Sequence, residues 1–241
     1  MNILAVIPAR YASTRFPGKP LVDIQGKPMI QRVYESVKKS ELFAEIVVAT
    51  DDERIVKVAE GFGAQVILTS EKHESGTDRC GEVISKLQYN YDIVVNIQGD
   101  EPMVNPLQLK ELIDVFKNPN AQIATLKTFI TNEQDIENPN VVKVVTSNDG
   151  KALYFSRSTI PYNRNNVVVP YFKHIGLYAY TSDSLRKITQ LSVGELEKIE
   201  SLEQLRWLEN GYNIYVAESN FKNIGIDTPE DLIELNKHYK F

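Results

Sequence analysis

The sequence contains a single cysteine, Cys80, among its 241 residues, so a disulfide bond within the chain is excluded. No apolar run reaches the length of a membrane-spanning helix. The opening run, Ile3–Ile7, is too short for the core of a signal peptide and has no basic flank. These absences predict a soluble protein of the reducing cytoplasm that has no membrane partner.

An excess of positive charge is also absent, because the formal net charge is −5 at pH 7. Such a chain is not expected to bind nucleic acid, although a few converging Arg and Lys side chains could still bind a small anion. The three histidines, His73, His174 and His238, lack the spacing of a metal site. No Ser or Cys nucleophile motif is present, so covalent catalysis has no support, and an isolated histidine is usually a structural or surface residue.

What is present is the composition of an ordinary globular protein, with 42% apolar and 24% charged residues. The length fits one large α/β domain, or one domain with a small lobe. Helical patterns at 29–37 and 55–62 alternate with short β-rich runs. The expected strands are Ile3–Ile7, Ile46–Thr50, Gln65–Leu68 and Ile93–Ile97. This alternation predicts an α/β fold with a Rossmann-like, mostly parallel sheet and helices on both faces.

The second half of the chain is less regular. Strands are expected at Ala124–Ile130, Val141–Val145 and Ile175–Tyr180, with a hairpin-type turn at 147–150. A leucine pattern at 202–208 indicates a helix that ends near Gly211, and a final helix is expected to begin at Thr228. We predict one domain over residues 1–241, with a smaller irregular lobe at about 131–215.

A basic loop follows the first predicted strand. The segment Pro8–Pro20 carries Arg10, Arg15 and Lys19 among small residues. Arginine forks and a lysine ammonium suit phosphate oxygens, although the glycine spacing of a P-loop is missing. A solvated surface loop explains the composition equally well. The position at the carboxyl end of a strand favours anion binding.

Two aspartates are candidates for a magnesium site. Asp100 follows the fourth predicted strand, where Mg²⁺ often takes one or two carboxylates together with phosphate oxygens and waters. The start of a turn explains Asp100 or Glu101 somewhat better when this block is considered alone. Asp227 is not needed as a helix cap, because Thr228 already provides one, and this favours a functional role for Asp227.

Two other polar segments follow expected strands. Asp51 and Asp52 could bind a metal, but helix capping explains Asp52 and we place neither in the predicted metal site. The segment Ser75–Arg79 has the pattern of a helix start, from which Thr77 and Arg79 could contact a base or ribose.

Several blocks occur in a characteristic order: Ile7–Leu21, Val48–Asp51, Ser75–Arg79, Asn96–Pro102, Tyr154–Pro161, His174–Tyr178, Glu203–Arg206 and Asp227–Leu232. Together they cover nearly the whole chain and closely resemble the 3-deoxy-manno-octulosonate cytidylyltransferases, or CMP-KDO synthetases. The resemblance implies a magnesium-dependent enzyme of lipopolysaccharide biosynthesis that joins CMP from CTP to KDO and releases pyrophosphate. The anomeric hydroxyl of the sugar would attack the α-phosphorus in line, with no strong protein base.

The resemblance also implies roles for the matching residues. Catalytic residues would be Lys19, Arg15, Asp100 and Asp227, of which the two aspartates would hold Mg²⁺. The nucleotide would be bound by Pro8, Ala9, Arg10, Ser75, Thr77 and Arg79. The sugar acid would be bound by Gln98, Arg157, His174, Tyr178, Glu203 and Gln204, with Arg157 facing the carboxylate. The family forms homodimers through the irregular half, so a homodimer is expected here.

Two departures from the family pattern leave alternatives open. Asp78 stands where glutamate is common, which is a minor change, and the acidic segment 194–200 lies next to a sugar-site block. Extra acid there would suit an 8-amino analogue of KDO, whereas Glu101 and the other sugar-site blocks favour KDO itself. The nearest rival is another sugar nucleotidyltransferase such as a CMP-sialate synthetase. The other alternative is a non-enzymatic nucleotide-binding module, against which the retained basic and acidic candidates argue.

Overall fold

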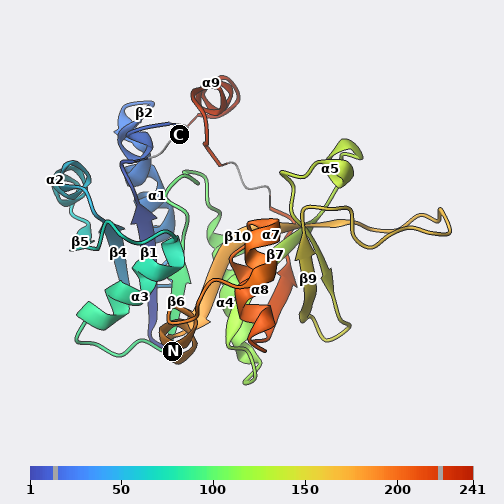
Figure 1. Ribbon diagram of the computed structural model, residues 1–241. Coiled ribbons are helices and arrows are strands. Elements are labelled where there is room, and N and C mark those ends of the chain that lie inside the picture. The colour runs from blue at the N-terminus through green and yellow to red at the C-terminus, as the bar shows by residue number, and fades with distance from the viewer. Residues whose placement is uncertain (13–15, 222–224, 241) are drawn as a thin grey trace. The chain divides into compact units, whose positions relative to one another are not determined.

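The computed structural model describes residues 1–12, 16–221 and 225–240, and the chain divides into two compact units (Figure 1). The first unit contains residues 1–110 and the C-terminal segment after residue 221, and the second contains Glu111–Phe221. Helix α4 (Pro106–Asp114) includes the boundary between them. The predicted irregular lobe falls within the second unit. The single-domain assignment stays a prediction.

Among its described residues, the first unit has four parallel strands in the order β6-β1-β4-β5: β1 (Ile3–Ala9), β4 (Glu45–Thr50), β5 (Gln65–Leu68) and β6 (Ile93–Asn96). β1 pairs in parallel with β4 and β6, and β4 pairs in parallel with β5. All of β6 and all of β1 except Pro8 are buried, as expected for parallel strands covered on both faces. These strands confirm the prediction for the first half of the chain.

Three helices connect these strands: α1 (Met29–Lys38), α2 (Glu53–Gly61) and α3 (Gly76–Lys86). The side chain of Asp52 caps α2 by accepting a hydrogen bond from the N–H of Arg54, which confirms the capping role predicted for Asp52. Ser75 caps α3 in the same way through the N–H of Asp78. Helix α2 begins soon after the end of β4, whereas residues 69–75 separate the end of β5 from α3.

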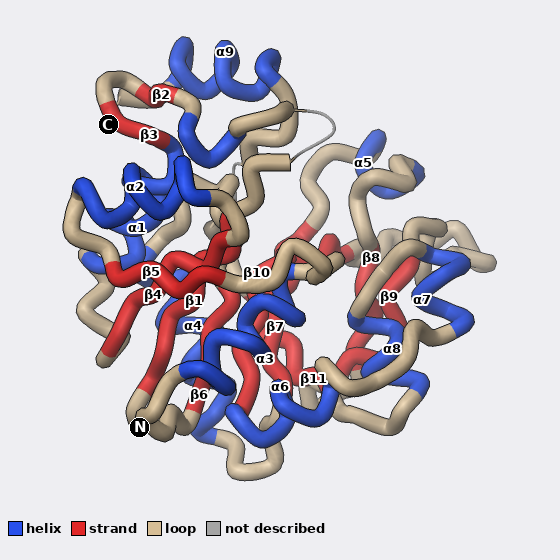
Figure 2. Tube along the Cα trace, turned by 60° about the vertical axis from the view of Figure 1, so that its left-hand side comes forward, coloured by secondary structure: helices blue, strands red, loops and turns tan. Residues whose placement is uncertain are grey.

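The connections place helices on both faces of this sheet, as predicted. Right-handed crossovers from β1 to β4 and from β4 to β5 put α1 and α2 on one face, and the return from β5 to β6 puts α3 on the other (Figure 2). The chain thus leaves β1 in one direction and comes back to its other side at β6. The carboxyl ends of β1 and β6 border this topological switch point, which is where open α/β sheets bind ligands.

The first unit is completed by η1 (Lys19–Leu21), β2 (Asp23–Ile24), β3 (Lys27–Pro28) and α9 (Pro229–His238). A buried cluster joins these segments, and its members Ile24, Met29, Ile226 and Leu235 are 0–1% exposed. Because Ile226 and Leu235 come from the end of the chain, this cluster anchors the segment before α9 beside the segment that leads into α1.

The second unit contains a mixed sheet of β7 (Ile123–Phe129), β8 (Lys143–Thr146), β9 (Ala152–Ser156), β10 (Phe172–Thr181) and β11 (Ile214–Glu218). β7 pairs antiparallel with β10 and parallel with β11, while β8 pairs antiparallel with β9 and β10. The helices are η2 (Val115–Lys117), α5 (Gln134–Glu137), α6 (Ser182–Ile188), α7 (Glu195–Glu200) and α8 (Gln204–Glu209). Antiparallel pairing explains why this half lacks a regular βα pattern.

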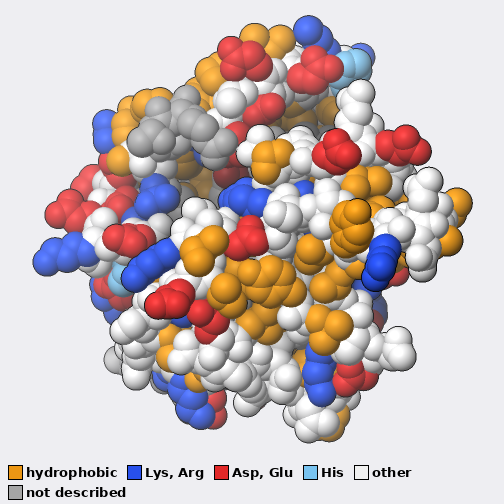
Figure 3. Space-filling view, turned by 45° about the vertical axis from the view of Figure 1, so that its right-hand side comes forward, with side chains coloured by type: hydrophobic (Ala, Val, Ile, Leu, Met, Phe, Trp, Pro, Cys, Tyr) orange, Lys and Arg blue, Asp and Glu red, His pale blue; other side chains and the backbone are white. Residues whose placement is uncertain are grey.

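The strands expected at 124–130, 141–145 and 175–180 are confirmed, although β8 begins two residues later than predicted. The helix predicted around residues 202–208 is α8, which ends at Glu209. The short elements β9, β11 and α6 were not anticipated, because runs of five to seven residues carry little periodicity. None of the helices in the described ranges is both long and apolar enough to cross a bilayer. Acidic and basic side chains are interspersed on the face drawn in Figure 3.

Candidate active site

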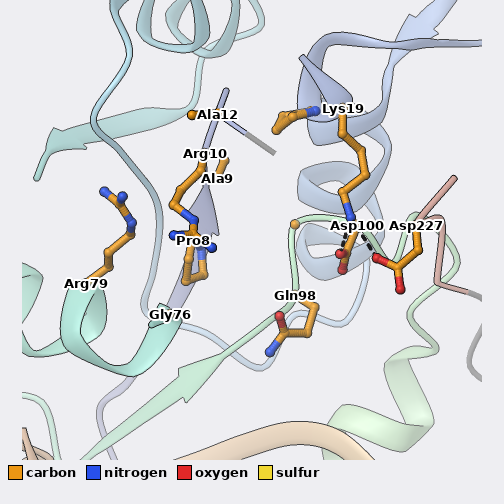
Figure 4. A pocket seen from close by; sticks show the side chains of 12 residues that line it. Pro8, Ala9, Arg10, Ala12, Lys19, Gly76, Arg79, Gln98, Asp100 and Asp227 are labelled. Carbon is orange, nitrogen blue, oxygen red and sulfur yellow. Dashed lines mark hydrogen bonds and ion pairs between the residues drawn. The ribbon is translucent and has the colours of Figure 1, made fainter. Parts of the chain in front are cut away.

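A cleft of about 410 Å³ opens in the first unit at the carboxyl ends of β1 and β6 (Figure 4). It is lined by Pro8, Ala9, Arg10, Ala12, Lys19, Pro20, Gly76, Arg79, Gln98, Gly99, Asp100 and Asp227. Eight of these residues were predicted to belong to the site. The predicted residues Ser75 and Thr77 lie at the start of α3 and are not among the described lining residues.

A lysine ammonium joins the two candidate metal ligands in this cleft. Nζ of Lys19 is 2.6 Å from Oδ2 of Asp100 and 3.1 Å from Oδ1 of Asp227 (Figure 4). The Lys19 side chain is 13% exposed, whereas that of Asp227 is 48% exposed, so the acidic pair faces the open part of the cleft. The structure thus brings together three charged residues that are far apart in the sequence.

Backbone contacts and a helix cap place Asp227 beside Asp100. The N–H of the fully buried Ile226 donates to the carbonyl oxygen of Asp100 at 3.0 Å. The N–H groups of Asp227 and Thr228 donate to Oδ2 of Asp231 at 2.9 and 2.8 Å, while Thr228 caps α9 through the N–H of Asp231. The capping box therefore fixes the backbone of Asp227, and its own carboxylate is left to face Lys19.

A backbone hydrogen bond across the basic loop supports the position of Lys19. Gly18 has a φ of 72°, in the left-handed region, and its N–H donates to the carbonyl oxygen of Tyr11 at 2.9 Å. The guanidinium of Arg54 lies 3.3 Å from the centre of the Tyr11 ring. Asp52 fixes this guanidinium through a 2.8 Å contact between Nε and Oδ1. A contact between α2 and the basic loop therefore supports the start of η1.

Gly99 allows two strand ends to approach each other closely. A Cβ atom at Gly99 would lie 2.5 Å from the carbonyl oxygen of Pro8, which is too short for any real contact. The close neighbour is the backbone at the end of β1, and Gly99 also lines the cleft. Because glycine has no Cβ, the ends of β1 and β6 can lie this close together at the switch point.

Arg79 is almost fully buried, with 1% exposure, and lies on the first turn of α3. Its guanidinium is 2.5 Å from Oδ2 of Asp51 and donates to Oγ1 of Thr69 at 2.7 Å and to the carbonyl oxygen of Ser70 at 3.2 Å. Nε of Arg79 is buried without a hydrogen-bond partner among the described residues. Asp51, which we kept out of the metal site, is therefore an ion-pair partner of Arg79.

Of the two arginines of the basic loop, Arg10 belongs to the described residues and Arg15 does not. Arg10 lies at the end of β1, lines the cleft and is exposed. Arg15, which we predicted as a catalytic cation, lies outside the described residues. The role of each in binding the triphosphate stays a prediction.

In the second unit, His174 and Tyr178 belong to an aromatic cluster. The His174 ring lies 5.1 Å from Phe155 and 5.4 Å from Tyr178, and Tyr178 lies 5.2 Å from Trp207, measured between ring centres. Burial lowers the pKa of His174 to about 3, so the ring is neutral near pH 7. Burial, with a smaller contribution from Glu203, raises the pKa of Tyr178 well above its usual value.

Two buried polar groups beside this cluster have no hydrogen-bond partner in the described part of the chain. They are the Tyr178 hydroxyl and Nε2 of Gln204, on side chains that belong to residues 7% and 5% exposed. An unsatisfied buried donor costs free energy, and such groups in a native protein commonly await a ligand or water. Both residues were predicted to contact the sugar. Glu203, also predicted, lies at the start of α8.

Arg157 donates hydrogen bonds to backbone carbonyl groups of the second unit. Its Nε donates to the carbonyl oxygen of Glu200 at 2.7 Å, Nη1 to that of Pro139 at 3.0 Å and Nη2 to that of Ser201 at 3.3 Å. Its backbone N–H donates to the carboxylate of Glu200. The guanidinium thus ties together three backbone segments of the second unit. Its predicted contact with a sugar carboxylate stays a prediction.

The donor set at Lys19 fits a hard divalent cation. Asp100 and Asp227 supply carboxylate oxygens, and a positive charge already lies between them in the form of the lysine ammonium. Groups of three or more His, Cys, Asp or Glu residues suited to a metal do not occur in residues 1–12, 16–221 and 225–240. A pair of carboxylates is what Mg²⁺ uses when nucleotide phosphates and waters complete its coordination.

Several residues that shape the site were not predicted from the sequence. Pro20 and Gly76 line the cleft, and Arg54 supports the loop from α2. Pro20 was visible in the basic segment, and Gly76 stands beside the cap of α3. Arg54 lacked any signal, because its contact with Tyr11 joins residues that only the fold brings together.

Comparisons with known proteins agree with this geometry. A family model described as cytidylyltransferase matches residues 4–220. The 3-deoxy-manno-octulosonate cytidylyltransferase of Parabacteroides distasonis is 52% identical over 242 residues, which cover 96% of this chain and 96% of that protein. The protein of the same description from Phocaeicola vulgatus is 54% identical over 241 residues, covering 96% of this chain and 95% of its own length.

Solved structures give the same result. A structure of CMP:2-keto-3-deoxy-manno-octonic acid synthetase complexed with CTP is 45% identical, covers 98% of each chain and has a TM-score of 0.93. The 4-diphosphocytidyl-2C-methyl-D-erythritol synthase of Anaerococcus prevotii is 16% identical, with a TM-score of 0.65 over 98% of this chain and 97% of that one. The second likeness shows the fold alone, and the first confirms the predicted α/β class with its mostly parallel sheet.

Proposed function

We propose that this chain, which belongs to the 3-deoxy-manno-octulosonate cytidylyltransferase family, transfers CMP from CTP to the anomeric hydroxyl of KDO and releases pyrophosphate. The product, CMP-KDO, serves lipopolysaccharide biosynthesis. The observation that carries the proposal is the convergence of Lys19, Asp100 and Asp227 at the switch point of the parallel sheet. The enzyme is a cytidylyltransferase of the same class as its relatives.

The cleft supplies positive and negative groups in the places that nucleotidyl transfer needs. Lys19 and Arg10 would neutralise the triphosphate, and Lys19 would offset the charge that grows on the departing pyrophosphate. Arg15 is proposed for the same task. Pro8, Ala9 and the first turn of α3 would hold the cytidine, partly through backbone groups. In-line displacement depends on positioning and on charge neutralisation, so no strong protein base is required.

Asp100 and Asp227 would hold Mg²⁺. When bound, this ion supplies Lewis-acid polarisation of the α-phosphate and orients the attacking hydroxyl. The backbone of each aspartate is already held, that of Asp100 by the contact with Ile226 and that of Asp227 by the cap of α9, and both carboxylates already contact Lys19. Lys19 would exchange its contacts with the carboxylates for contacts with phosphate oxygens.

The proposed sugar contacts follow the sequence prediction. The neutral ring of His174, the hydroxyl of Tyr178 and the amide of Gln204 are hydrogen-bonding groups in a buried part of the second unit. Glu203 at the start of α8 is proposed as a further contact. Gln98, which lines the cleft of the first unit, and Arg157 complete the set of predicted sugar-site residues.

A homodimer is part of the proposal. The loop between β9 and β10 exposes Tyr162, Val167 and Val168, which are 86%, 55% and 105% exposed, and exposed apolar groups on one loop favour burial by a partner. Light scattering of the protein as it elutes from a size-exclusion column should give twice the mass of the 27.4 kDa chain. A monomer at all concentrations would contradict this part of the proposal.

The decisive test is release of pyrophosphate from CTP with Mg²⁺ and KDO. Three comparison reactions separate the alternatives: CTP with 8-amino-KDO, CTP with sialic acid, and UTP or GTP with a hexose 1-phosphate. We expect turnover with KDO to exceed turnover in all three. Faster turnover with 8-amino-KDO would change the proposed substrate, and turnover only with sialic acid or a hexose phosphate would contradict the proposed function.

A further inference from the structure

A buried hydroxyl contacts the ring of His174 within the second unit. Thr125 on β7 is 0% exposed, and its Oγ1 is 3.0 Å from Nε2 of His174 on β10. The same oxygen is 3.0 Å from the carbonyl oxygen of Ile175 and 2.8 Å from that of Leu177. The hydroxyl oxygen therefore lies within hydrogen-bonding distance of these three groups, and the two carbonyl oxygens can only accept a hydrogen bond.

These two carbonyl groups reach Thr125 because β10 bulges at this point. Ile175 pairs with Leu126 and Tyr178 pairs with Thr125, so the register of β10 against β7 shifts between Ile175 and Tyr178. A bulge of this kind interrupts the ladder and turns backbone groups away from their usual partners. The hydroxyl of Thr125 lies where it can satisfy one of them, which links the bulge to His174.

The donors and acceptors around Thr125 indicate which nitrogen of the His174 ring carries the proton. The hydroxyl has one proton. If Thr125 donated it to Nε2, its oxygen would face two carbonyl oxygens at 3.0 and 2.8 Å with no proton between them. If Thr125 donates to one carbonyl oxygen instead and its lone pair accepts a hydrogen bond from an Nε2–H of His174, only the other carbonyl oxygen faces the hydroxyl oxygen without a proton between them, so this arrangement leaves one such contact in place of two.

The ring carries only one proton near neutral pH, because burial lowers the pKa of His174 to about 3. With that proton on Nε2, Nδ1 carries a lone pair. Within the described residues, the hydrogen bonding of this ring is confined to Thr125. Nδ1 is therefore a neutral acceptor that the described protein does not satisfy.

We infer that Thr125 is a positioning residue that fixes the Nε2–H tautomer of His174, so that Nδ1 accepts a hydrogen bond from a hydroxyl group of the sugar substrate. This inference rests on the proposed function, since it assigns His174 to the sugar. It also defines the chemistry that His174 recognises: a lone pair attracts a hydroxyl proton and repels a carboxylate, so His174 binds a hydroxyl and another group must bind the acid.

The test compares Thr125→Val, which keeps the shape and removes the hydroxyl, with Thr125→Ser, which keeps the hydroxyl. Nitrogen NMR of protein labelled with ¹⁵N-histidine reports which ring nitrogen is protonated, and His174→Gln identifies the His174 signals among the three histidines. We expect Nε2–H in the wild type and in Thr125→Ser. We expect loss of this preference in Thr125→Val.

Kinetics supply the second measurement. Loss of one fixed hydrogen bond should raise KM for KDO about tenfold in Thr125→Val, with KM for CTP unchanged and with recovery in Thr125→Ser. A wild-type spectrum with the proton on Nδ1 would overturn the inference. So would a Thr125→Val protein that keeps both the Nε2–H tautomer and the wild-type KM for KDO. If Thr125→Val does not fold, the wild-type and Thr125→Ser spectra still decide the tautomer.

The tautomer is measured without substrate, so its outcome is separate from that of the proposed function. If wild-type protein releases no pyrophosphate from CTP and KDO, the proposed function fails, and the spectrum still reports whether Thr125 fixes the ring of His174.

Discussion

Replacing Asp100 by asparagine removes one negative charge from the cleft and leaves the size of the side chain almost unchanged. In the structure this carboxylate is 2.6 Å from the Lys19 ammonium, and its backbone carbonyl accepts the hydrogen bond from Ile226. The substitution preserves the backbone contact. It changes only the charged group that we assign to Mg²⁺.

The two expected effects of Asp100→Asn differ greatly in size. A Lewis acid at the α-phosphate is worth several kcal/mol in the transition state, and a loss of about 4 kcal/mol corresponds to roughly a thousandfold lower kcat. Stability should change by less than about 1 kcal/mol, because the side chain of Asp100 is 30% exposed and Lys19 keeps its contact with Asp227. Activity should therefore fall while the protein remains folded.

The assay measures pyrophosphate release over a range of Mg²⁺ concentrations, together with the midpoint of thermal unfolding. Asp149→Asn is a matched control, because Asp149 forms an exposed ion pair with Lys151 outside the cleft. This control should keep the wild-type kcat. If Asp100→Asn retains kcat within about threefold of wild type at every Mg²⁺ concentration, the assignment of Asp100 to the metal is refuted, since the expected loss is several kcal/mol.

Other substitutions test the supports of the site. Gly99→Ala should lower CTP affinity and kcat, because a Cβ at 2.5 Å from a carbonyl oxygen forces two strand ends apart. In the control Gly61→Ala the added Cβ meets no atom within 4 Å, so a titration with CTP should give the wild-type affinity. Thr228→Ala removes the cap of α9 beside Asp227, so it should lower both the free energy of unfolding, by about 1 kcal/mol, and the activity. Thr181→Ala removes the cap of α6 and should lower only the free energy of unfolding. Denaturant unfolding and the pyrophosphate assay measure the two effects. Burial opposes ionisation of Glu82, but its hydrogen bonds hold its pKa at about 2, against an ordinary value of 4.5. Its ionised form therefore stabilises the fold above about pH 4.5, and the stability difference from Glu82→Gln should shrink as pH falls toward 2.

Much of the fold could be predicted because its strongest signals are local. The four strands of the first unit are short β-branched runs separated by amphipathic helices, and this pattern fixes a parallel sheet with few alternatives. The caps of α2 and α9 were also readable, because a capping residue acts within three or four positions of itself. Placing charged residues just after β1 and β6 then located the cleft.

The remainder depended on contacts that join distant parts of the chain. Arg79 was expected to contact a base or ribose, and it lines the cleft, but its ion pair with Asp51, 28 positions away, was not foreseen. Gly99 belongs to the block Asn96–Pro102, and its close approach to the backbone of Pro8 was not foreseen either. In both cases the sequence drew attention to the segment that contains the residue. The partner could not be identified, because spacing in the sequence does not encode which strand ends become neighbours.

The Lys19 contacts explain how the cleft can hold two carboxylates beside one ammonium group. Two negative charges that share one cation would repel each other if the cation were absent, and the lysine ammonium offsets that repulsion in the free protein. Neither carboxylate has to move away before substrate arrives. The same ammonium then becomes available when nucleotide phosphates bring their own cation, so one side chain can serve the free protein as a counter-ion and the reaction as a partner of the leaving group. Lys19→Met should therefore separate the acidic pair in the free protein, in addition to lowering kcat.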